Sequence, residues 1–174
     1  STFEQPPGVE YAKDMANGYR SNGERIAGLY HIYPEKAAAG LWTTPSDLAR
    51  VILELQNPGA PFKPETIRTM LTRGAGDWAL GIGRHTTRGR ESFSHGGANA
   101  GFRCMMFGYL DSGDGAVVMT NGDNASRLAN EILSAIATEY GWVDYLPQEK
   151  TVVEVDPAVL RSYVGDYTFM GGPV

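Results

Sequence analysis

The chain has 174 residues, of which 42% are hydrophobic and 20% are charged, and its formal net charge is −5. This composition is typical of a globular domain, and the length suffices for one core and the beginning of a second unit. The acidic balance leaves no basic stripe for phosphates, and no apolar run approaches the roughly 18 residues of a membrane span, so we expect neither a nucleic-acid partner nor a membrane span.

Residues 1–41 are rich in glycine, proline and polar side chains, and this pattern predicts extended loop with short strands. A helix is predicted to begin after Thr44, because Pro45 suits the first helical position and Asp47 suits the first turn. Apolar residues then recur at helical spacing, and Asn57-Pro58-Gly59 ends the helix; these residues are Leu48, Val51, Ile52 and Leu55. A second short helix is predicted from Pro64 to about Thr72.

From Trp78 the hydrophobic pattern changes to short runs separated by tight turns. Four strands are predicted, at residues 78–86, 91–95, 103–110 and 116–120. Connections this short permit antiparallel neighbours only. A helix over residues 125–140 is predicted to cover one face of this sheet with Leu128, Ile132 and Ile136, backed by Ala129 and Leu133. The fold class is therefore α+β.

The organisation along the chain follows from these elements. We expect one domain over residues 1–143, in which residues 1–73 form a loop and helix part and residues 74–143 form the sheet and its terminal helix. The charged, proline-containing segment 144–156 is interpreted as a linker. Residues 157–174 are interpreted as the start of a truncated, appended β-rich unit, since they are too few to fold alone.

The most informative stretch is residues 92–102, Ser-Phe-Ser-His-Gly-Gly-Ala-Asn-Ala-Gly-Phe. Gly96 and Gly97 remove side chains from a strand edge, so a ligand can approach the backbone N–H groups. His95 beside such an edge suits an acyl-transfer enzyme, in which backbone donors stabilise an oxyanion and the imidazole supplies hydrogen bonding. The competing interpretation is a structural turn or bulge, for which glycine pairs are common.

Several segments together resemble the serine beta-lactamase superfamily, specifically its class C beta-lactamase-related esterase and peptidase branch. They cover most of the first 143 residues and are 1–6, 16–19, 34–49, 94–102 and 117–122. The resemblance implies a transpeptidase-like fold, as in penicillin-binding proteins, and a serine hydrolase acting through an acyl-enzyme on an ester, amide or lactam. It also implies a location outside the cytoplasm.

The resemblance assigns roles to the histidine and glycines. His95, Gly96 and Gly97 match the family's strand element, which is Lys-Thr-Gly or a variant such as His-Gly-Gly. Ala98 matches the residue whose backbone amide supplies one oxyanion donor. We therefore expect His95 and Ala98 to be catalytic and Gly96, Gly97 and Asn99 to bind substrate, although Asn99 can equally hold a turn. Glycines in place of lysine and threonine favour an ester or peptide substrate over a lactam.

Two further family elements, Ser-x-x-Lys and Tyr-x-Asn, occur nowhere in the 174 residues. In the family the serine attacks the carbonyl, and the lysine and tyrosine handle its proton. We therefore expect a C-terminal fragment of a parent hydrolase that is inactive alone and associates with itself or with the missing N-terminal half. The alternative is a non-catalytic binding or regulatory module.

The remaining conspicuous residues suggest no other chemistry. The three histidines show no metal-ligand spacing, so we expect neither a metal nor a cofactor, and the partner is a small-molecule or peptide substrate. Cys104 is the one cysteine and is interpreted as a buried structural thiol. Trp42 and Phe102 suit either a substrate cleft or core packing.

Overall fold

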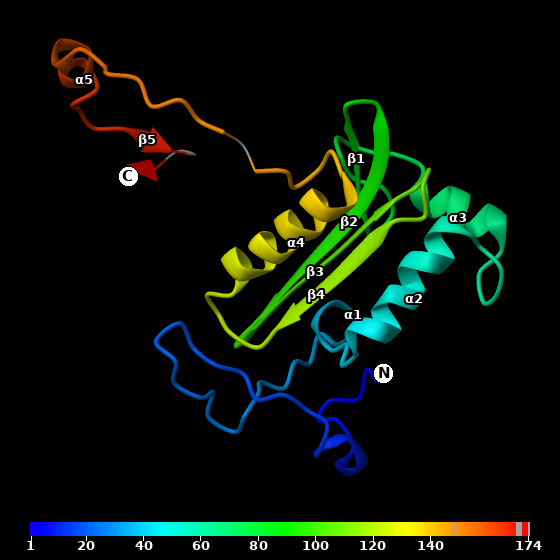
Figure 1. Ribbon diagram of the computed structural model, residues 1–174. Helices are drawn as coiled ribbons and strands as arrows, with labels where there is room; N and C mark the ends of the chain where they lie inside the picture. Colours follow the sequence, from blue (N-terminus) through cyan, green and yellow to red (C-terminus); the bar gives the residue numbers. More distant parts are fainter. Residues whose placement is uncertain (148, 170–171, 174) are drawn as a thin grey trace.

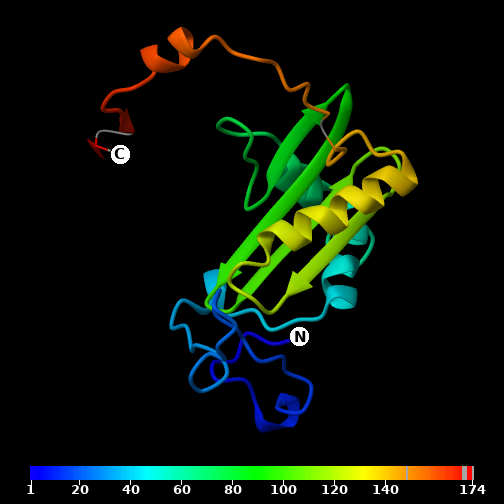
Figure 2. The ribbon, with the colours of Figure 1, turned by 60° about the vertical axis from the view of Figure 1, so that its left-hand side comes forward.

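The computed structural model describes residues 1–147, 149–169 and 172–173. An antiparallel sheet lies at its centre, in the order β1-β2-β3-β4. The strands are β1 (Gly83–Thr87), β2 (Arg90–Asn99), β3 (Phe102–Tyr109) and β4 (Gly115–Thr120). Helix α4 (Ser126–Tyr140) lies on one face, and α2 (Pro45–Gln56) and α3 (Pro64–Leu71) lie on the other, as Figures 1 and 2 show. The predicted α+β class, with an antiparallel sheet and a helix packed on it, is confirmed.

The strand boundaries differ from the prediction at two places. Residues 78–82 were expected in the first strand but contribute only an isolated bridge between Trp78 and Gly83, because a turn closed by the Ala79 N–H on the Ile82 carbonyl folds the chain there. The second strand was expected to stop at His95, yet it continues through both glycines to Asn99. It continues because β3 offers a partner at every position, up to Asn99 opposite Phe102.

The strands β1 and β2 are joined by a two-residue loop, Arg88-Gly89. Both residues have positive φ, at 51° and 83°, which is the backbone that a type I′ hairpin turn requires. This turn fixes the register of the two strands, with Thr87 opposite Arg90 and Gly83 opposite Ser94. Since β1 begins at Gly83, β2 has no β1 partner beyond Ser94.

The α4 face of the sheet is packed with aromatic residues. Phe107 and Tyr109 are buried against Ala137 and Trp142, with ring centroids 4.9 Å apart between Phe107 and Tyr109. Ala137 of α4 packs against these rings, because a larger side chain would not fit between the helix and the sheet there. The inward face of α4 is therefore Ala129, Leu133 and Ala137, and the predicted stripe is wrong in part: Leu128 is 52% exposed and Ile132 is 38% exposed.

The opposite face is covered by α2 and α3, and the predicted extents of both helices are confirmed. Thr44 caps α2 by accepting a hydrogen bond from the Asp47 N–H at 3.1 Å. The buried cluster on this face joins the two helices to the sheet and contains Ile52, Leu55, Ile67, Leu71, Ile82, Phe93 and Met106. Val51, which was expected on the apolar face of α2, is instead 41% exposed.

The terminal segments lie at the periphery. Residues 1–41 contain a short 3₁₀ turn (Val9–Tyr11), α1 (Lys36–Ala39) and isolated β-bridges at Thr2, Tyr19 and Arg25 in place of the predicted short strands. They wrap the end of the sheet where β2 and β4 end (Figure 1). After α4 the chain leads to α5 (Pro157–Ser162) and a hairpin of β5 (Thr168–Phe169) and β6 (Gly172–Pro173), apart from the sheet. The domain and linker boundaries remain predictions. Within the described ranges, no helix has both the length and the apolar character to cross a membrane.

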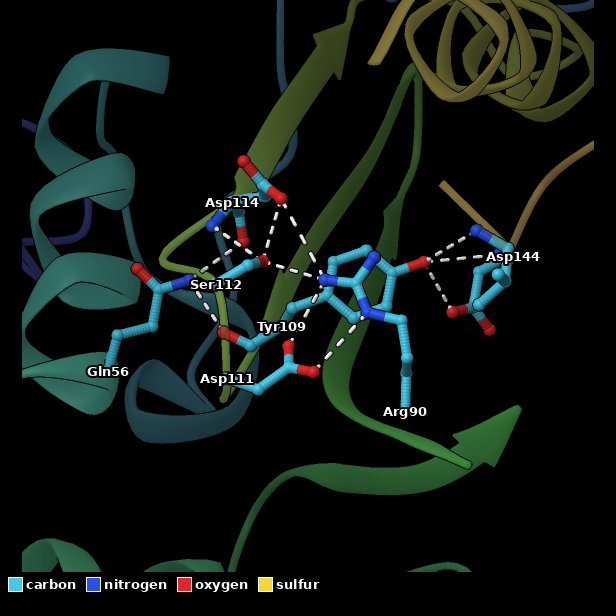
Figure 3. Close-up of polar contacts among 8 residues, drawn as sticks. Gln56, Arg90, Tyr109, Asp111, Ser112, Asp114 and Asp144 are labelled. Carbon is cyan, nitrogen blue, oxygen red and sulfur yellow. Dashed lines mark hydrogen bonds and ion pairs between the residues drawn. The ribbon is translucent and has the colours of Figure 1, made fainter. Parts of the chain in front are cut away.

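A polar cluster fastens the end of the sheet where β2 begins (Figure 3). The Arg90 guanidinium carbon lies 3.6 Å from the centroid of the Tyr109 ring, and Arg90 also donates to Asp111. The Tyr109 hydroxyl donates to Asp144 at 2.6 Å, and burial together with this bond raises the pKa of Tyr109 to about 12. Gln56 of α2 donates to the Tyr109 carbonyl at 2.9 Å. The cluster therefore joins α2, the sheet and the segment after α4.

Candidate active-site edge

The residues His95 to Ala98, here called the glycine edge, occupy the part of β2 that β1 does not reach. All four are exposed, whereas Ser92 and Phe93 earlier in the same strand are fully buried. On one side the glycine edge is paired with β3. Because N–H groups alternate in direction along a strand, those on the other side are free to bind a ligand.

The Trp78 ring contacts the ring of His95. The Trp78 ring lies edge-on to the His95 ring, with centroids 6.3 Å apart, and Trp78 is 57% exposed. The loop before β1 places Trp78 there, since the Asp77 carbonyl accepts from the Arg84 N–H at 2.7 Å. Sequence analysis missed this contact because it assigned Trp78 to a strand.

The turn that follows the glycine edge is held by three hydrogen bonds, two to the N-terminal segment and one to the segment after β4. The Asn99 side-chain amide donates to the Ala39 carbonyl at 2.8 Å, and the Ala100 N–H donates to the Tyr33 hydroxyl at 2.9 Å. The Gly101 N–H donates to Asp123 at 2.7 Å. These bonds fix the backbone of the edge before any ligand arrives, which is what an oxyanion site requires.

The bond to Ala39 bears on the two interpretations of Asn99. Its amide nitrogen is engaged by the protein, which favours the turn-holding role over a contact with substrate. Asp123, which follows β4, contacts the same turn, and the Gly101 N–H and the guanidinium groups of Arg20 and Arg103 hold the pKa of its carboxyl below the usual value. Asp123 is thus the anchor of the turn.

The two glycines are required for different reasons. A Cβ at Gly97 would lie 2.6 Å from the Cys104 sulfur, so the thiol of the paired strand occupies the space of a side chain. A Cβ at Gly96 would make only ordinary van der Waals contacts, the nearest with the Met105 methyl at 3.4 Å and the Cys104 carbonyl oxygen at 3.7 Å. Packing therefore explains why residue 97 is glycine, but it does not explain why residue 96 is glycine. The thiol itself is partly buried, and burial raises its pKa.

Trp42 and Phe102 belong to an aromatic cluster. The Trp42 ring packs edge-on against Tyr30 and Phe102, with centroid distances of 5.0 Å and 5.7 Å. Phe102 also crowds Gly18, where an added Cβ would lie 2.8 Å from its ring. This packing joins the N-terminal segment to the start of β3, so it supports the core interpretation of both residues.

A second polar arrangement lies on the neighbouring strand pair. His85 Nε2 and Ser94 Oγ are 2.9 Å apart, and both residues are partly buried. Sequence analysis missed this Ser94–His85 pair because it requires the register of two strands. The signal was the Arg88-Gly89 dipeptide, since a two-residue turn places His85 opposite Ser92 and diagonal to Ser94.

The antiparallel sheet with helices on both faces fits the fold of penicillin-binding proteins. A family model described as Beta-lactamase matches residues 2–139, and the chain belongs to this family. The predicted superfamily is thereby confirmed, and with it a serine hydrolase-type fold. A search of curated proteins found no significant match.

Proposed function

We propose that the chain provides the oxyanion-binding strand of a serine hydrolase that acts on an ester or peptide through an acyl-enzyme. The observation that supports this proposal best is the exposed glycine edge, which is open on one side and fixed at its far end by hydrogen bonds to Ala39, Tyr33 and Asp123. A preorganised edge of this kind stabilises an oxyanion without reorganisation during the reaction.

Each residue then has a role. The Ala98 amide donates to the carbonyl oxygen as it becomes an oxyanion, and His95 orients a hydroxyl group, since neutral imidazole can donate one hydrogen bond and accept another. Gly96 keeps the approach to the backbone clear. The attacking serine and its lysine and tyrosine come from Ser-x-x-Lys and Tyr-x-Asn elements elsewhere in the parent protein, so the 174 residues alone do not carry out acyl transfer at the glycine edge.

We further propose that the chain associates with the remainder of its parent or with a second copy. Strand β4 is an edge of the sheet, with β3 as its sheet neighbour among the described residues, and it carries neither proline nor charge to block pairing. Leu128 and Ile132 add exposed apolar surface on α4. Sedimentation of the chain at micromolar concentration tests this: a compact monomer that binds no apolar dye contradicts it.

The catalytic proposal is tested by hydrolysis of a short-chain nitrophenyl ester in the intact parent. His95→Ala and Gly96→Val are compared with wild type, and His31→Ala is the matched control because His31 is an exposed histidine of the N-terminal segment. Loss of one oxyanion-hole contact costs about 10²–10³ in rate, so we expect losses of that order at residues 95 and 96 only.

Two outcomes are informative against the proposal. If the two edge variants fold and keep wild-type turnover, the glycine edge is structural. If the intact parent binds acylated ligands without turning them over, the protein is a binding or regulatory module of the same fold.

A further inference from the structure

The Ser94–His85 pair joins a hydroxyl to an imidazole across the first two strands. Ser94 lies opposite Gly83, and His85 follows two residues later in β1, so the two side chains are diagonal neighbours on the same face of the sheet. His85 Nε2 lies 2.9 Å from Ser94 Oγ, within the distance that a base needs to accept the hydroxyl proton. Among the described residues, this is the only serine bound to a histidine ring.

Gly83 makes this geometry possible. A Cβ at Gly83 would lie 3.0 Å from His85 Nε2 and 3.3 Å from the Ser94 carbonyl oxygen. The missing side chain therefore leaves the space that the imidazole occupies on its way to Ser94. A side chain at residue 83 would displace the imidazole.

His85 and Ser94 line a cavity. This cavity has a volume of about 270 Å³ and is lined by His85, Ser94, Thr87, Phe107, Asp144 and Tyr145. Ser94 pairs with Phe107 on the α4 face, whereas His95 pairs with Met106 on the face of α2 and α3. Successive residues of a strand point to opposite faces, so the cavity is separate from the glycine edge.

We propose that Ser94 is a second nucleophile, with His85 as its general base, and that it accepts small acyl groups from activated esters. Ser94 Oγ attacks the ester carbonyl, the Oγ–C bond forms, and the hydroxyl proton passes to His85 Nε2. The C–O bond to the leaving alcohol then breaks, and the imidazolium returns its proton to the departing oxygen or to water. Attack by water on the acyl-serine, with His85 again taking the proton, releases the carboxylic acid and restores Ser94.

The cavity supports a dyad and a small substrate. Asp144 lines it, but its carboxylate oxygen accepts the hydrogen bond of the Tyr109 hydroxyl, so Asp144 is already engaged by the sheet (Figure 3). Thr87 and Tyr145 supply the other hydroxyl groups of the lining. The cavity is largely open to solvent, and its volume of about 270 Å³ is enough for a short acyl chain, just below the range of about 300–1,000 Å³ typical of drug-sized ligands.

The test uses the 174-residue chain and p-nitrophenyl acetate, with acetylation sites mapped by peptide mass spectrometry. We expect Ser94 to be acetylated faster than Ser112, an exposed serine of the loop between β3 and β4 that contacts no histidine, by at least about tenfold. His85→Gln and Gly83→Ala should each slow acetylation of Ser94, by up to the 10²–10⁴-fold that general bases contribute. Ser112→Ala should leave it unchanged.

The comparison of Ser94 with Ser112 within wild-type protein decides the question even if a variant fails to fold. Equal acetylation of the two serines overturns the proposal, and so does a folded His85→Gln variant that reacts at the wild-type rate. Either result makes the Ser94–His85 pair a structural hydrogen bond. Neither result bears on the glycine edge, which is tested separately in the intact parent.

Discussion

Adding one methyl group at Gly97 separates the packing role of the glycine edge from its proposed catalytic role. The φ angle of this residue is not positive, so alanine meets no backbone strain there. The new Cβ would instead lie 2.6 Å from the Cys104 sulfur. Since heavy atoms in contact normally keep about 3.5–4.0 Å, either the thiol or β2 must move by about 1 Å.

The cost follows from overpacking. Inserting a methyl group into a filled site typically costs ~1–3 kcal/mol, and replacing glycine by alanine in an allowed conformation returns ~0.4–1 kcal/mol. The net destabilisation expected for Gly97→Ala is therefore about 1–2 kcal/mol, which is a large part of a typical folding free energy of 5–15 kcal/mol. Gly96→Ala is the matched control, because its Cβ makes only ordinary van der Waals contacts, the nearest with the flexible Met105 methyl at 3.4 Å.

Urea unfolding of four proteins measures the effect: wild type, Gly97→Ala, Cys104→Ala and the double variant. Removing the sulfur should relieve the clash, so the double variant should be more stable than the sum of the single changes predicts, by about 1 kcal/mol or more. The reasoning is refuted if Gly97→Ala is as stable as Gly96→Ala, or if Cys104→Ala gives no relief.

Three further predictions concern stability. Leu133→Ala should lower the free energy of unfolding in urea by about 2–5 kcal/mol, because Leu133 is fully buried on the face of α4 that packs against the sheet, whereas Leu128→Ala on the exposed face should change it by less than about 0.5 kcal/mol. The pKa of the Asp123 carboxyl is lower in the folded protein than in the unfolded chain. The ionised carboxylate therefore stabilises the fold at pH values above its unfolded pKa, and this stabilisation is lost as the pH falls through its folded pKa. Asp123→Asn should accordingly make the free energy of unfolding depend less on pH below about pH 4. The pKa of Tyr109 is raised to about 12, so its contribution to the free energy of unfolding is complete below pH 10 and is lost between about pH 10 and 12. A Tyr109→Phe variant whose alkaline unfolding matches that of wild type would contradict this prediction.

Local sequence patterns predicted the helices well. Thr44 and Pro45 specify the start of α2 through bonds within one turn, so no distant residue is needed to place it. The inward face of α4 was harder to predict, because Leu128 and Ala129 both fit a helical stripe. Which of them is buried depends on the residues across the interface, where Ala129 packs in one buried cluster with Val118 of β4 and with Leu133.

The sequence by itself determined the family, the antiparallel order of the strands and the position of the His-Gly-Gly motif, because each of these is encoded within a short stretch or a short connection. Only the tertiary structure decided that β2 runs through the glycines, that Gly97 faces Cys104 and that Ser94 meets His85. These three facts depend on the register between strands. A shift of register by one residue would turn every side chain to the opposite face, and the hydrogen-bonded pairs that prevent such a shift form only when the sheet assembles.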